Sequence, residues 1–170
     1  MIFVTVGNAT QRFRRLLDAV DELKGKGLFH QEPVFIQTGH NPDFHPRYCG
    51  HKPFLGMDEF QQQMEKADLI ITHGGCGTLL QCVRLGKVPV VMPRRKKYGE
   101  HVNDHQVQLI EALAAEGRVV PAYVPEDLPE AIAEARRRAG LPCLPPRSRM
   151  LELVAQAIEE LLGRRYESAG

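Results

Sequence analysis

Short apolar runs alternate with amphipathic stretches along the chain. Runs rich in β-branched residues predict strands at 2–6, 34–37, 53–55, 68–72, 88–92 and 118–120. Apolar positions spaced three or four residues apart predict helices at 10–24, 57–66, 78–85, 104–116, 125–138 and 147–162. Strands that alternate with helices predict a Rossmann-like α/β fold with a doubly wound, mostly parallel sheet. Ligands of such sheets bind beyond the carboxyl ends of the strands.

The densest group of glycines lies where the strand predicted at 68–72 gives way to a helix. The segment contains His73, Gly74, Gly75, Gly77 and Thr78. Glycines let backbone N–H groups approach an anion closely, and the start of the helix behind them carries about half a positive charge. We therefore expect a phosphate or diphosphate to bind here. The alternative is that the three glycines only make a tight turn.

The turn after the first predicted strand contains one glycine, Gly7, followed by Asn8. A dinucleotide-binding turn at this place would need the pattern GxGxxG, so the sequence disfavours NAD. The glycines at 74–77 do not form a P-loop, because no Lys-Ser or Lys-Thr pair follows them.

A second polar segment follows Pro93 and leads into the helix predicted at 104–116. Its hydrogen-bonding residues are His101, Asn103, Asp104, His105, Gln106 and Gln108. Such neutral or weakly charged groups suit a hydroxyl-rich ligand such as a sugar, although they are also typical of a solvated helix start. The two histidines have i, i+4 spacing, which raises a metal site as an alternative, but no third ligand is evident and no metal is expected. The run from Arg94 to Lys97 is typical of a solvated loop, or of one that attracts a diphosphate or an anionic lipid surface.

Gln81 lies about one turn into the helix behind the glycines. From that place its side chain reaches either a ribose or solvent, and the sequence leaves the two alternatives open.

Composition narrows the class of protein. The chain has 170 residues, 43% of them apolar, with a net charge of +1. Nothing in this balance indicates a nucleic-acid partner. No apolar run approaches the roughly 20 residues that span a bilayer, and the amino terminus is expected to be a strand and not a signal peptide. Four cysteines without CxxC spacing favour reduced thiols in the cytoplasm.

Three motifs together resemble a known family. The runs HGGCGT, GKVPVVMPR and HVNDHQVQL are similar to the carboxyl-terminal domain of glycosyltransferase family 28. The similarity is greatest to its short single-lobe members, which are PssE-type subunits of bacterial exopolysaccharide synthesis and the catalytic subunit of the dolichol-linked N-acetylglucosaminyltransferase. The opening VTVGN resembles their start as well, so that the likeness covers about residues 2–125.

The resemblance implies one lobe of a GT-B glycosyltransferase, the lobe that holds the nucleotide sugar. Residues 1–146 would form this domain, and residues 147–170 would add an amphipathic helix and tail that pack on this lobe or on its partner. Gly74, Gly75, Gly77 and Thr78 would contact the diphosphate, and His105 and Gln106 the donor sugar. Relatives usually carry a ribose-binding Glu at the position of Gln81. The full set expected to bind the nucleotide sugar is Gly7, Asn8, His73, Gly74, Gly75, Gly77, Thr78, Gln81, His101, His105 and Gln106.

The expected function is donor binding in a two-subunit inverting transferase that moves a sugar from a UDP-sugar to a lipid-linked acceptor. The acceptor lobe would be a membrane-anchored, PssD-like protein that holds this chain at the cytoplasmic face of the membrane. The sequence identifies no general base; the partner, His40 or His73 could supply one. Three alternatives stay open: a nucleotide-sugar binding module without activity, a UDP-sugar 2-epimerase, and an NAD-dependent oxidoreductase.

Overall fold

The computed structural model describes residues 1–139, which form a six-stranded parallel sheet in the order β3-β2-β1-β4-β5-β6. The strands are β1 (Ile2–Thr5), β2 (Val34–Gln37), β3 (Gly50–Lys52), β4 (Leu69–His73), β5 (Val90–Met92) and β6 (Val120–Pro121). Every paired neighbour runs parallel. The chain order reverses between β1 and β4, which are hydrogen-bonded neighbours in the middle of the sheet. The doubly wound α/β prediction is confirmed.

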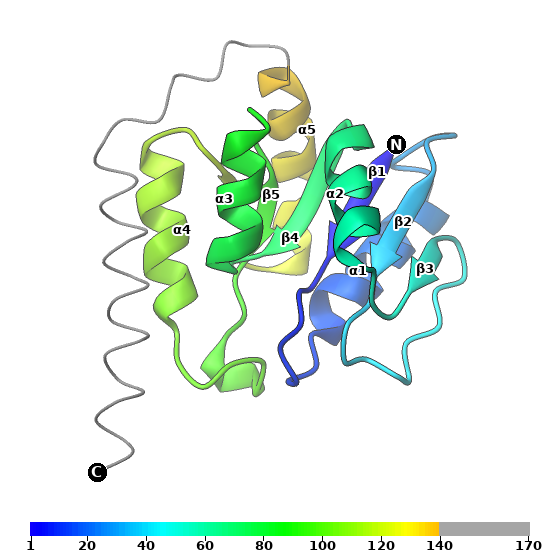
Figure 1. Ribbon diagram of the computed structural model, residues 1–170, viewed down its shortest axis with the longest axis horizontal. Coiled ribbons are helices and arrows are strands. Elements are labelled where there is room, and N and C mark those ends of the chain that lie inside the picture. Colours follow the sequence, from blue (N-terminus) through cyan, green and yellow to red (C-terminus); the bar gives the residue numbers. More distant parts are fainter. Residues whose placement is uncertain (140–170) are drawn as a thin grey trace.

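Helices cover both faces of this sheet (Figure 1). They are α1 (Arg14–Gly25), α2 (Met57–Lys66), α3 (Cys76–Arg84), α4 (His105–Ala115) and α5 (Leu128–Arg138), with short 3-10 turns at Lys96–Tyr98 and Pro125–Asp127. Alternate residues of each buried strand point to opposite faces. Val4 and Ile71 therefore pack with α1 and α5, whereas Phe3 and Ile70 pack with α2 and α3.

The helices pack against the sheet through their apolar sides. Leu16, Leu17 and Val20 of α1 are fully buried against one face, beside Leu128 and Ile132 of α5. On the other face Leu79 of α3 packs with Ile110 and Leu113 of α4 over Val91. The packing of the helices on the two faces of the sheet fixes how α3 and α4 are oriented. It therefore also fixes the geometry of the loops at the carboxyl edge, from which these helices begin.

Two predicted boundaries were wrong. The third strand is Gly50–Lys52, not 53–55, because these exposed residues pair with Phe35–Gln37, and backbone pairing does not require apolar side chains. The first helix begins at Arg14, not at residue 10. Asn41 Oδ1 accepts the Phe13 N–H at 2.9 Å, so residues before Phe13 belong to the loop after β1.

The predicted helix at 147–162 and the domain boundary at 146 lie outside the described residues, and their packing stays a prediction. Within residues 1–139 no helix is both long enough and apolar enough to span a bilayer.

Candidate functional site at the carboxyl edge of the sheet

The predicted site residues gather at one edge of the sheet. Gly7 and Asn8 follow β1, the segment 73–78 joins β4 to α3, and the loop from Pro93 joins β5 to α4. Because β1, β4 and β5 are adjacent and parallel, these segments leave the sheet side by side, at the lower edge in Figure 1. The segments that carry the predicted site residues therefore lie together at the carboxyl ends of the strands, and the binding of a nucleotide sugar there stays a prediction.

His73 is the centre of this edge. Its ring is 8% exposed, and its Nδ1 lies 3.3 Å from Thr72 Oγ1. A Cβ built on Gly7 would lie 2.5 Å from the ring, and one built on Gly75 would lie 2.2 Å from it. Burial, and next the charge of Arg94, lower the pKa of His73 from 6.5 to about 3. The ring fills the space between two turns, and a pKa this low makes it a poor proton acceptor, which argues against His73 as the general base.

The three glycines of the β4–α3 turn serve different purposes. Gly75 must lack a side chain because the His73 ring occupies that space. Gly74 must lack one because Ile110 Cδ1 and Gln106 Cβ of α4 lie 2.8 and 2.9 Å from the position of its Cβ. Gly77 faces open space, with no atom within 4 Å of that position. Packing thus explains Gly74 and Gly75, but it does not explain Gly77.

The first turn of α3 begins without a side-chain cap from residues 1–139. Gly75 is the N-cap, and no side chain of the described residues caps this turn. Gly77 is exposed and Thr78 half-buried. The first N–H groups of a helix have no partner within it, and together with the helix dipole they form a site for an anion. The geometry supports the predicted position for a phosphate.

The loop after β5 corrects one prediction. Arg94 is not a solvated loop residue; its side chain is fully buried. Its guanidinium donates to the carbonyl oxygens of Val6 at 2.8 Å, Gln11 at 2.7 Å and Glu100 at 3.1 Å. Nearby, Glu100 is also buried and pairs with Arg15 at 2.8 Å. Sequence reasoning missed both roles because a run of basic residues in a polar loop resembles a solvated surface.

His101, His105 and Gln106 lie at the start of α4, as predicted. His101 is half-buried and accepts the Asn103 N–H at Nδ1, whereas His105 is exposed. Gln106 Oε1 accepts the Arg94 N–H at 3.0 Å, so this amide helps to fix the loop, and only its nitrogen end is left for a ligand. Among residues 1–139 no three His, Cys, Asp or Glu side chains are placed to share a metal ion.

Gln81 is hydrogen-bonded to the neighbouring helix. Its amide nitrogen donates to Gln61 Oε1 on α2. A ribose contact by Gln81 remains a prediction, and it would compete with this hydrogen bond.

Gln37, at the carboxyl end of β2, is a further polar residue of this edge that the sequence did not single out. It is 3% exposed, and its Nε2 lies 3.4 Å from Asn8 Oδ1. Its Oε1 is buried without a hydrogen-bond partner among the described residues. A glutamine that ends an otherwise apolar strand was the available signal, because such a side chain must find a partner at the edge.

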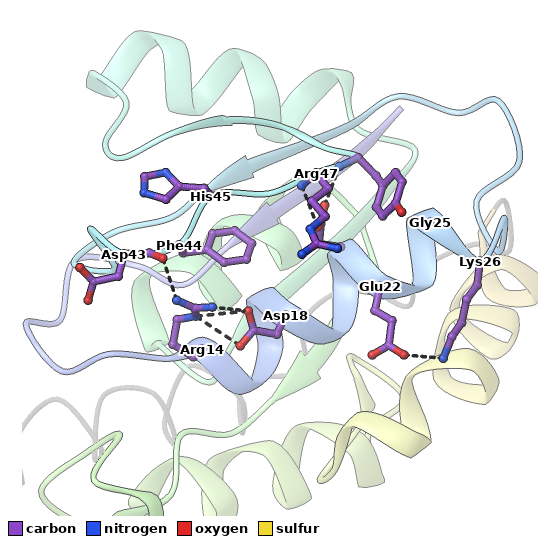
Figure 2. Close-up of a pocket in the computed structure, with 11 residues that line it drawn as sticks. Arg14, Asp18, Glu22, Gly25, Lys26, Asp43, Phe44, His45 and Arg47 are labelled. Carbon is purple, nitrogen blue, oxygen red and sulfur yellow. Dashed lines mark hydrogen bonds and ion pairs between the residues drawn. The ribbon is translucent and has the colours of Figure 1, made fainter.

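A separate polar groove lies between α1 and the loop 41–49, and Figure 2 shows its side chains. Arg14 stacks over Phe44 and pairs with Asp18 at 2.7 Å, and Glu22 pairs with Lys26. Below them Asp21 accepts the N–H groups of Arg47 and Tyr48 at 2.8 and 3.0 Å. None of the predicted site residues lines this groove.

Comparison with known proteins agrees with this geometry. The model of the glycosyltransferase family 28 C-terminal domain matches residues 1–158. The chain belongs to this family. Its strands, its glycine turn and the polar start of α4 all lie within the matched range, and the predicted resemblance is confirmed.

Individual relatives are longer than this chain. The UDP-N-acetylglucosamine transferase subunit ALG13 of Homo sapiens is 36% identical over 125 residues, which is 69% of this chain and 10% of that protein. The protein of the same name from Mus musculus is 34% identical over 127 residues, also 10% of its length. The ALG13 subunit of Yarrowia lipolytica matches over 60 residues, 29% of its length.

A solved structure shows the same fold. The glycotransferase of kitacinnamycin superposes with a TM-score of 0.59 at 15% identity, over 91% of this chain and 37% of that one. The family 28 domain thus adopts the predicted Rossmann-like α/β fold, which it shares with part of that glycotransferase.

Proposed function

We propose that this domain is the donor-binding part of a glycosyltransferase that uses a UDP-sugar. The observation that carries the proposal is the uncapped first turn of α3, where Gly77 lies in open space beside the half-buried Thr78. The diphosphate of the donor would lie against these amides. The family match supports a transferase, and the printed name of the ALG13 relatives supports a UDP-sugar as donor.

The chemistry follows from where charge develops. Inverting transfer breaks the bond between the sugar and the diphosphate, and the leaving UDP gains negative charge. Fixed N–H groups at the start of α3, together with its dipole, would stabilise that charge. The nitrogen of Gln106 and the exposed His105 would hold the sugar, because both lie at the start of α4, next to the turn.

The acceptor would come from a second polypeptide. The described domain provides one Rossmann-like sheet, and GT-B transferases bind the acceptor on an opposing lobe. The word "subunit" in the relatives' name supports such a partner. We propose a membrane-anchored, PssD-like partner that supplies the general base and presents a lipid-linked acceptor at the cytoplasmic face of the membrane, in exopolysaccharide or glycolipid synthesis.

Calorimetry of the full chain with UDP, UDP-sugars and NAD tests the first half of this proposal. We expect UDP and at least one UDP-sugar to bind and NAD not to bind. A Gly77→Val variant would place a branched side chain over the amides, and its UDP affinity should fall by at least about tenfold. Ala115→Val is the matched control, since it puts the same residue on the exposed end of α4. Equal UDP affinity of Gly77→Val and the wild type would contradict this site.

Co-expression with a membrane-anchored partner tests the second half. Membranes that hold both chains should transfer sugar from a UDP-sugar to lipid, and either chain alone should not. If the chain binds UDP-sugars but no partner restores turnover, the alternative of a binding module without activity is favoured.

A further inference from the structure

Arg94 joins the two loops on either side of the glycine turn. Val6 and Gln11 bracket the loop after β1, and Glu100 ends the first half of the loop after β5. The residues that follow Val6 and Glu100 are Gly7 and His101, both predicted to bind the donor. One planar guanidinium therefore sets the separation of these loops through three backbone carbonyls.

This buried cation has no carboxylate of its own. Within residues 1–139 no acidic side chain forms an ion pair with Arg94, because the buried Glu100 carboxylate is bound to Arg15 and to the Arg95 N–H. The Arg94 guanidinium also lies 4.9 Å from the centre of the buried Phe13 ring, whose face attracts a cation but carries no net charge. Arg15 and Arg94 thus share the charge of one carboxylate, Glu100, and the two guanidiniums keep a net positive charge close to His73.

The effect of this charge extends into the glycine turn. Burial lowers the pKa of Arg94 to about 10, so that the side chain remains protonated at neutral pH. Its charge contributes to the low pKa of His73, which wedges apart Gly7 and Gly75. A field that disfavours a proton on His73 favours an anion at the same turn.

We propose that Arg94 is a positioning residue for the donor diphosphate: it holds the loop after β1 and the loop after β5 at a fixed separation and supplies a buried positive charge beneath the anion. Arg94 contacts no ligand in this proposal. It acts by positioning Gly7 and His101 and by the electrostatic effect of its charge on the glycine turn. The inference rests on the proposed function, because it assumes that a diphosphate binds at α3.

The test compares UDP with uridine, which lacks the phosphates, on the full-length chain. For Arg94→Met we expect the UDP affinity to fall by about tenfold or more, and the uridine affinity, measured by ligand-observed NMR, to change by less than about twofold. For Arg94→Lys, which keeps the charge but cannot span three carbonyls, we expect an intermediate loss of about threefold. Arg14→Met is the control, since it removes an arginine from the separate groove.

A second readout follows the histidine. In Arg94→Met the pKa of His73, followed by NMR of its ring, should rise, because a positive neighbour has been removed. If Arg94→Met is not recovered folded, Arg94→Lys carries the test, again with UDP against uridine.

The outcomes separate the two proposals. Wild-type protein that fails to bind UDP contradicts the proposed function. Wild-type protein that binds UDP, with variants that lose UDP and uridine affinity equally or lose neither, contradicts the role of Arg94.

Discussion

Two polar regions of this domain are built with the same device and opposite charge. Beside α1, the buried Asp21 carboxylate accepts two backbone N–H groups and fixes the loop 41–49. At the glycine edge, the buried Arg94 guanidinium donates to three backbone carbonyls and fixes two loops. Each side chain replaces water for a loop that would otherwise carry unpaired polar groups. A single charged residue can thus organise a loop in either region.

The difference lies in what surrounds the charge. In the groove of Figure 2 the neighbouring charges are paired with one another, as Arg14 is with Asp18 and Glu22 is with Lys26. At the glycine edge Arg15 and Arg94 share the single carboxylate of Glu100, and the first turn of α3 at the same edge has no side-chain cap within residues 1–139. A hollow lined with polar groups is therefore not enough to mark an anion site. The surplus of positive charge and free N–H groups distinguishes the glycine edge from the groove.

The largest effect we expect is a dependence of stability on pH that originates at the glycine edge. His73 has a pKa of about 3 when folded and an ordinary pKa of 6.5 when unfolded, so below pH 6.5 the unfolded chain binds a proton that the folded protein excludes. The stabilisation is complete above pH 6.5 and is lost as the pH falls toward 3. The slope approaches 1.4 kcal/mol per pH unit, and the loss at pH 4 reaches about 3 kcal/mol.

Chemical denaturation at pH 7, 5.5 and 4 measures this loss, with His73→Gln as the reference that lacks a titrating ring. The free energy of unfolding should fall more steeply with decreasing pH in the wild type than in the variant, so that any advantage of the wild type at pH 7 shrinks. Parallel curves for the two proteins would show that the ring is not held neutral.

A smaller effect is expected in the groove. Asp21→Ala leaves the Arg47 and Tyr48 N–H groups without their acceptor, and the free energy of unfolding should fall by about 2 kcal/mol. UDP affinity should stay within about twofold of the wild type, because the groove holds no predicted donor residue.

Asp18→Ala is the matched control for this variant. Its carboxylate lies on the same helix but is 53% exposed, so removal of its pair with Arg14 should cost about 0.5 kcal/mol or less. A large loss of UDP affinity in Asp21→Ala would show that the groove contributes to donor binding. It would contradict the distinction between the groove and the glycine edge.

The smallest effect concerns Gln81. If it binds the ribose, it must first leave Gln61, so Gln61→Ala should raise UDP affinity by about twofold, and Gln81→Ala should lower it by about threefold. Calorimetry of both variants decides the point. Unchanged affinity in Gln81→Ala would place this side chain outside the donor site.

Local patterns were sufficient for most of the fold. The apolar runs of β1, β2, β4 and β5 are buried whatever the details of the loops, and the helix pattern needs only one apolar side. The short edge strand β3 was misplaced because Gly50, His51 and Lys52 carry no strand signal of their own. Their conformation is imposed by pairing with β2.

Part of the candidate site could also be predicted from local sequence, and part could not. The glycine turn could be recognised because three glycines before a helix have few other purposes, and the position of α4 follows from chain order. The role of Gln37, the separate tasks of Gly74, Gly75 and Gly77, and the pair of Gln81 with Gln61 could not be read locally. Gln37, Gly74 and Gln81 each depend on a contact with a residue that is distant in the sequence, and the task of Gly75 depends on where the nearby His73 ring lies.

By itself, the sequence determined a doubly wound parallel sheet, the edge at which the predicted site residues lie, and the family. The sheet and the edge follow from hydrophobic period, glycine placement and chain order, and the family follows from three short motifs; all of these can be read along the chain. Only the tertiary structure decided that Arg94 is buried and that His73 stays neutral. The free energy of a buried charge depends on which partners lie around it, and the carbonyl of Val6 that meets Arg94 is 88 residues away along the chain.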